Sequence, residues 1–213
     1  MEQARRQAIA PLPARPVTAA AGLRHAAGVE HCDQCGFAYD ENTATMAAAA
    51  IRAGAAQLTA ILADGPAGLP ARPEPGRWSP LEYACHVRDM LLVQRERLLA
   101  ARRFDRPECQ PMGRDERVEL DGYAAQNPAD VARQLGDAAQ LFANDLDRLG
   151  GADWDRRVIY SYPRRAERSL RWLAIHTVHE LRHHLLDVRQ QIPGETALTP
   201  AEREASDGRL PPG

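Results

Sequence analysis

The stretch SLRWLAIHTVHELRHHLLDVRQQI, residues 169–192, decides the fold of this chain. Ser169 is a favourable N-cap and Pro193-Gly194 stops the pattern, so the stretch is predicted to form one helix. At about 100° per residue its apolar side chains share one face, which predicts packing against other helices. That face consists of Leu170, Ala174, Val178, Leu181, Leu185, Val188 and Ile192.

The same stretch carries four of the seven histidines of the chain, together with two carboxylates. Glu180 and His184 lie one turn apart at the edge of the apolar face. Leaving such polar groups buried and unpaired costs about 1–3 kcal/mol each, and a divalent metal would satisfy several of them together. Other polar side chains are expected close by, namely His176, His183 and Asp187.

Two further helices have clear start signals. Ser79, Pro80 and Glu82 form the N-cap, first position and capping box of a helix that should run to about Arg102. Asn127-Pro128 opens the next helix by the same chemistry, and Gly150-Gly151 should end it.

An alanine-rich helix is predicted over residues 43–63, before the Asp64-Gly65-Pro66 stop. Residues 104–123 are rich in charges and prolines, so we expect no regular structure there. Val158, Tyr160 and Tyr162 alternate with polar neighbours, which predicts a short hairpin before the last helix. Four long helices with one crossover indicate an all-α protein, a four-helix bundle over residues 43–192.

The residues outside the bundle are predicted to form a leader, a knuckle and a tail. Residues 1–30 have an Ala/Pro/Arg bias and no secretory signal, and we expect a disordered leader; residues 193–213 should be a flexible tail. Residues 31–41, HCDQCGFAYDE, place Cys32 and Cys35 at zinc-knuckle spacing. This pair fits one half of a structural zinc site, a redox pair or two free thiols. Candidates to complete a zinc site are His31, His25 and Cys109.

The composition narrows the function classes. All 27 basic residues are Arg, which excludes a Schiff-base lysine mechanism. The net charge of −2 gives no reason to expect nucleic acid as a partner. We expect a cytoplasmic protein, because no run of eighteen apolar residues suggests a membrane span and the few cysteines suit a metal or thiol role.

A bundle builds metal sites from side chains on facing helices, so we place His86 of the second helix opposite Glu180 and His184. Two imidazoles and a carboxylate suit zinc, which we expect first, or nickel or iron, and leave positions open for water or substrate. His179 should lie away from the core, where it would either face solvent or contact a metal ligand from outside. If the last helix were rotated, His179 and His183 would replace Glu180 and His184.

The segments WSPLEYACHVRD (78–89) and HTVHELRHHLLDV (176–188) resemble the DinB/YfiT-like superfamily of four-helix-bundle metalloenzymes. That family typically carries W-S-x-x-E-x-x-x-H on its second helix and H-x-x-x-H on its last. Here Glu180 replaces the first histidine of the later pair, and E-x-x-x-H with a following Asp is similar to the mycothiol-dependent maleylpyruvate isomerase branch. The resemblance implies His86, Glu180 and His184 as metal ligands.

The resemblance also implies a function. Its members include transferases and isomerases that use a small thiol such as mycothiol, so the expected partners are a thiol and a small-molecule substrate, and a homodimer is expected. His183 or His176 would be the acid/base group or would orient Glu180 from outside, and Asp187 would be an outer contact of a ligand. One alternative is a metal-dependent hydrolase. Another is a non-catalytic metal-binding stress or interaction protein that recruits a partner through Cys32 and Cys35.

Overall fold

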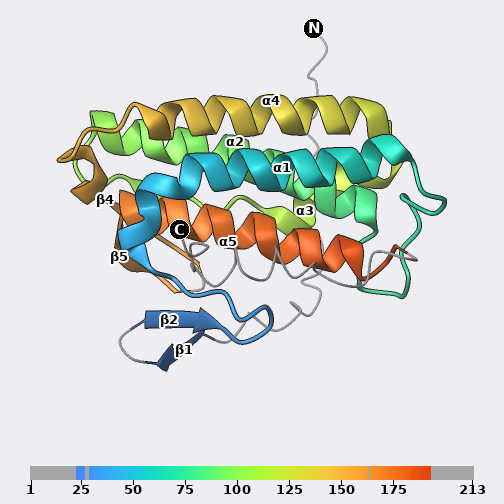
Figure 1. The fold of residues 1–213 in the computed structure, drawn as a ribbon, viewed down its shortest axis with the longest axis horizontal. Helices are drawn as coiled ribbons and strands as arrows, with labels where there is room; N and C mark the ends of the chain where they lie inside the picture. The colour runs from blue at the N-terminus through green and yellow to red at the C-terminus, as the bar shows by residue number, and fades with distance from the viewer. Residues whose placement is uncertain (1–22, 27–28, 163, 193–213) are drawn as a thin grey trace, which may run out of the picture.

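A computed structural model describes residues 23–26, 29–162 and 164–192 of the chain. In this part the longest elements are four helices that pack side by side (Figure 1). Contacts run in a ring from α1 to α4, α2, α5 and back to α1, so α1 lies diagonally opposite α2. The predicted four-helix bundle is confirmed. Its helices are α1 (Ala47–Asp64), α2 (Pro80–Arg103), α4 (Pro128–Asp147) and α5 (Leu170–Arg189).

The helices begin where the cap residues predicted. The side chains of Ser79, Asn127 and Ser169 each accept a hydrogen bond from a backbone N–H in the first turn of α2, α4 and α5. The helix ends are less well predicted. α4 ends at Asp147, before the two glycines, because Arg148 already leaves the helical conformation.

Glu82 joins the start of α2 to the loop that precedes it. Its carboxylate accepts hydrogen bonds from Arg72 Nε at 2.8 Å and from the Ser79 backbone N–H at 2.7 Å. Although burial opposes ionisation, these two donors hold the pKa of Glu82 below its usual value. The first turn of α2 is thereby fixed, one turn before His86 on the same helix.

Replacing Glu82 with glutamine should therefore lower the free energy of unfolding by about 1–3 kcal/mol at neutral pH, because the partly buried contact with Arg72 loses its charged acceptor. Since folding lowers the pKa of Glu82, its contribution is present at neutral pH and lost as pH falls below about 4. Urea unfolding at neutral and acid pH measures both effects. Glu119, an exposed partner of Arg72, is the matched control, and Glu119→Gln should cost about 0.5 kcal/mol or less.

One face of the helix α1 packs into the bundle core. Together with the preceding 3₁₀ helix η1 (Glu41–Met46) it spans 24 residues and is long and apolar enough, by length and composition alone, to cross a membrane. Its large side chains, Ile51 and Leu58 among them, are instead buried against the neighbouring helices. A Cβ at Gly54 would lie 2.0 Å from Leu181 Cδ2, so the glycine lets α1 and α5 approach closely.

The connection from α2 to α4 has regular structure, so the prediction of an irregular segment there was wrong. It contains β3 (Glu108–Cys109), α3 (Arg114–Leu120) and the 3₁₀ helix η2 (Tyr123–Ala125). The helix α3 is short and highly charged, and its one buried residue is Val118. So short and polar a segment does not show the apolar pattern from which a helix could be predicted.

A small sheet precedes α5, after the 3₁₀ helix η3 (Asp153–Asp155). The strands β4 (Arg157–Tyr160) and β5 (Ala166–Ser169) pair antiparallel, which confirms the predicted hairpin. β3 adds a third strand in parallel to β4. β3 could not be predicted from the sequence, because two residues are too few for an alternating pattern.

The N-terminal segment forms a second hairpin beside α5 (Figure 1), from β1 (Leu23–Ala26) and β2 (Val29–Cys32). Most residues of this hairpin belong to the predicted disordered leader, and the prediction missed the two strands. Residues 1–22 and 27–28 of that leader, and the predicted tail 193–213, lie outside the described residues.

Candidate metal centre

The helix α5 presents two pairs of polar side chains on adjacent faces. His179 and His183 lie one turn apart, and so do Glu180 and His184, rotated from the first pair by about 100°. The Glu180 pair faces α2, and the His179 pair faces the N-terminal segment. One helix therefore contributes to two clusters. In the described residues a third group of potential ligands, His176, His179 and Glu180, shares one residue with each of them.

The first cluster joins α2 to α5. Potential ligand atoms of His86, Glu180 and His184 lie within 4.8 Å of one another. The rings of His86 and His184 are 4.9 Å apart, and His184 Nε2 lies 3.7 Å from Glu180 Oε2. His86 is buried, and its Nδ1 has no hydrogen-bond partner. The structure thus brings together the three residues that were predicted as ligands, and an unpartnered buried imidazole is consistent with a metal-binding role.

The charges in this cluster suit a cation. Burial, followed by the nearby His184, lowers the pKa of His86 to about 3, so this ring is neutral at physiological pH. Although burial opposes it, contacts with His179 and His184 hold the pKa of Glu180 well below its usual value. At neutral pH the site offers a neutral imidazole nitrogen and an anionic carboxylate, the forms in which these residues ligate metals.

Asp187 lies behind His184, with Oδ2 3.0 Å from His184 Nδ1. Burial disfavours a charged His184, but Asp187 and Glu180 outweigh it and raise the pKa of His184. A carboxylate on the far nitrogen fixes the orientation of a metal-binding imidazole, which is the arrangement predicted for Asp187. Two aromatic rings border the cluster: Tyr83, 5.2 Å from His184, and Trp78, 5.1 Å from His86. Tyr83 was not identified from the sequence.

The second cluster contains the two cysteines. Potential ligand atoms of Cys32, Cys35, His179 and His183 lie within 4.8 Å of one another. Of the two alternatives for His179, exposure to solvent was wrong, since its side chain is buried. Its Nδ1 lies 3.2 Å from Glu180 Oε1, which fits the other alternative, a contact with a predicted metal ligand. The alternative in which a rotation of the last helix exchanges Glu180 and His184 for His179 and His183 is not needed. Each of these two pairs takes part in its own cluster.

The cover over His179 comes from the segment that follows β2. The Phe37 ring lies 5.4 Å from the His179 ring, and the Tyr39 hydroxyl lies 2.8 Å from His179 Nδ1. These residues are about 140 positions away in sequence, so the helical pattern of α5 alone could not indicate the contact. The aromatic residues after the CxxC were the available signal.

The two predicted acid/base histidines lie outside the first cluster. His176 stacks on Trp172 at 4.6 Å and lies 3.2 Å from the Tyr39 hydroxyl; burial lowers its pKa to about 4. His183 Nδ1 lies 3.9 Å from Cys32 Sγ. The acid/base role of either residue stays a prediction.

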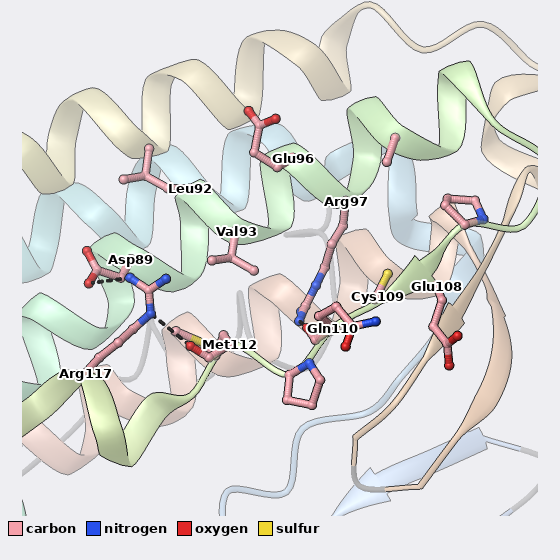
Figure 2. Close-up of a pocket in the computed structure, with 13 residues that line it drawn as sticks. Asp89, Leu92, Val93, Glu96, Arg97, Glu108, Cys109, Gln110, Met112 and Arg117 are labelled. Atoms are coloured by element: carbon pink, nitrogen blue, oxygen red, sulfur yellow. Dashed lines mark hydrogen bonds and ion pairs between the residues drawn. The ribbon is translucent and has the colours of Figure 1, made fainter. Parts of the chain in front are cut away.

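The other proposed partners of the cysteines lie elsewhere or outside the described side chains. Cys109 is buried on β3, and His31 belongs to neither cluster. Cys109 lines a hollow of about 540 Å³ beside α2 (Figure 2). Arg97 and Arg117 in this hollow already donate to the carbonyl oxygens of Gln110 and Met112, and no lining residue belongs to either cluster.

Comparison with known proteins adds the family. The DinB superfamily matches residues 49–188, about two thirds of the chain. The chain belongs to the DinB superfamily. The fold is also similar to the structure described as "YfiT from Bacillus subtilis is a probable metal-dependent hydrolase with an unusual four-helix bundle topology". That similarity has a TM-score of 0.59 at 15% identity, over 70% of this chain and 84% of the other. Comparison with curated proteins finds no match.

The region that matches the DinB superfamily contains the whole first cluster, His86, Glu180 and His184. It begins after the N-terminal hairpin, so Cys32 and Cys35 lie outside it. This DinB protein thus combines a cluster within the family region with a second one that depends on its own N-terminal segment.

Proposed function

We propose that this protein is a metal-dependent enzyme that uses a low-molecular-weight thiol of the mycothiol type in a transferase or isomerase reaction. The observation that carries the proposal is the cluster of His86, Glu180 and His184. Three protein ligands leave coordination positions free, which is typical of catalytic rather than structural metal sites. A divalent metal there would supply Lewis acidity and lower the pKa of a coordinated thiol, so that a thiolate forms at neutral pH.

The protein side chains have distinct parts in this proposal. His86 and His184 would hold the metal with neutral nitrogens, and Glu180 with an anionic oxygen. Asp187 would keep His184 in one orientation through its 3.0 Å contact. Tyr83 and Trp78 would border the space for substrate, because their rings lie against those of His184 and His86.

The choice of a thiol rests on the motif of α5. Glu180, His184 and Asp187 form the E-x-x-x-H pattern with a following Asp that is similar to the mycothiol-dependent branch. Zinc is the metal we propose first, since two imidazoles and one carboxylate form one of its common catalytic ligand sets.

Hydrolysis is the second candidate, and the likeness to a fold described as a probable metal-dependent hydrolase favours it. The same ligands could then activate water instead of a thiol. The two reactions differ in their need for a cosubstrate.

Turnover measured with and without thiol separates these candidates. The zinc-loaded protein would be assayed with an electrophilic aryl halide and with a panel of esters and amides, each in the presence and absence of mycothiol. The proposal expects conjugation of the electrophile that depends on both thiol and metal. Ester or amide cleavage that is unaffected by thiol would contradict it and support the hydrolase. Absence of metal-dependent turnover with every substrate would contradict both.

A further inference from the structure

The turn from Cys32 to Cys35 is already shaped to present two sulfur atoms. The Cys32 N–H donates to Phe37 O at 2.9 Å and the Gly36 N–H donates to Cys32 O at 2.9 Å. Gly36 has φ of +69°, which a glycine adopts without strain. Both cysteines are free thiols. The turn is therefore held by backbone hydrogen bonds and does not depend on a disulfide.

The turn also favours a thiolate. The backbone N–H groups of Cys35 and Gln34 are directed at the Cys32 sulfur, where they stabilise negative charge. The thiolate is the form of cysteine that binds metals. A pair of such sulfurs provides half of the ligands of a structural zinc site.

Two imidazoles of α5 lie opposite the turn. His183 Nδ1 is 3.9 Å from Cys32 Sγ. His179 uses Nδ1 for the Tyr39 hydroxyl at 2.8 Å and Glu180 Oε1 at 3.2 Å, while its Nε2 is buried without a hydrogen-bond partner. Leaving a buried polar atom unpaired destabilises the fold, so this nitrogen needs a partner.

We propose that Cys32, Cys35, His179 and His183 bind a zinc ion in a closed, four-ligand structural site. In a tetrahedral zinc site with Zn–S distances of about 2.3 Å, two sulfurs lie about 3.8 Å apart. The four ligand atoms already lie within 4.8 Å of one another, so a small contraction completes the site. Two thiolates and two imidazoles fill all four positions, and no place remains for a substrate.

This zinc site fastens the N-terminal segment to α5. Other contacts lie along the same seam: Tyr39 is buried against α5, Arg168 pairs with Glu30 at 3.6 Å, and the Ser169 hydroxyl contacts Glu41. The metal would add coordinate bonds to the aromatic and polar contacts that hold this segment on the bundle. Its role is structural, so the inference does not depend on the proposed catalytic function.

Two carboxylates of α5, Glu180 and Asp187, contact histidines of both the zinc site and the first cluster. Glu180 Oε1 lies 3.2 Å from His179, and its Oε2 lies 3.7 Å from His184. Asp187 Oδ2 lies 3.0 Å from His184 and 3.9 Å from His183. A ligand of the first cluster is thus an outer contact of the zinc site, and the zinc site positions Glu180 through His179.

Cobalt substitution tests the site, because thiolate ligands give Co²⁺ an intense charge-transfer absorption that imidazole and carboxylate ligands do not. Wild-type protein should bind two equivalents of Co²⁺ and show this band. Cys35→Ser and His183→Gln should each lose one equivalent and most of the band. His86→Gln should lose the other equivalent and keep the band. Unchanged stoichiometry and absorption in Cys35→Ser would overturn the proposal.

Thiol reactivity of the wild-type protein gives a second test that needs no variant. Cys35, which is partly exposed, should react with a thiol reagent only after a strong chelator removes zinc, whereas Cys32, Cys85 and Cys109 are buried. The expected result is at least one additional reactive thiol on chelation, at Cys35. Equal reactivity with and without chelator, or a Cys32–Cys35 disulfide in metal-free purified protein, would overturn the proposal even if Cys35→Ser failed to fold.

Discussion

His86→Gln should leave a folded protein that binds one metal equivalent fewer and has lost at least about a hundredfold of its activity. His86 is the only contribution of α2 to the first cluster, and it belongs to no other group of potential ligands in the described residues. Glutamine keeps a polar side chain of similar size at this buried position, so the loss reports ligation rather than a cavity. Metal analysis by mass spectrometry and turnover on the same preparation measure both effects.

The matched control is His31→Gln, the same exchange at a histidine that belongs to neither cluster, and it should keep both metal equivalents. Asp187→Asn should give an intermediate effect, with metal affinity lower by about 10–100-fold, because Asp187 contacts only the far nitrogen of His184. Full metal content and activity in His86→Gln would contradict the assignment of this cluster as the metal centre.

Local chemistry explains why most of the fold could be predicted. Ser79, Asn127 and Ser169 are caps whose hydrogen bonds reach only two or three residues along the chain, so the sequence alone identifies where each helix begins. The three residues of the first cluster could be predicted from the sequence for a related reason. Glu180 and His184 are one turn apart on one helix, and His86 stands on a motif typical of the superfamily.

The errors arose where contacts join distant parts of the chain. The helical pattern of α5 places His179 away from the bundle core and allows it to face solvent, but Phe37 and Tyr39 cover that face of α5. The partners of Cys32 and Cys35 depend on the same long-range contacts. Both halves of the second cluster can be recognised in the sequence, one as the CxxC of Cys32 and Cys35 and the other as the pair His179 and His183. That these two halves meet depends on tertiary packing.

Chelation should lower the melting temperature of the wild-type protein on the order of 10 °C. A ligand that binds only the folded state, present at a thousandfold excess over its Kd, stabilises by about 4 kcal/mol. For a chain of this length each kcal/mol shifts the melting temperature by about 2–4 °C. Four-ligand zinc sites are tight, so removal of zinc should release much of this stabilisation.

The Cys32→Ser/Cys35→Ser double variant separates the two metals. It should melt near the temperature of the chelated wild type, and chelation should shift it much less, because only the metal of the open first cluster remains to be removed. His86→Gln should behave in the opposite way, keeping most of the chelator-induced shift, since its four-ligand site is intact. If the double variant showed the full shift and His86→Gln none, the metal of the first cluster would be the one that stabilises the fold. Cys32 and Cys35 would then have no part in holding the N-terminal segment on α5 through a metal.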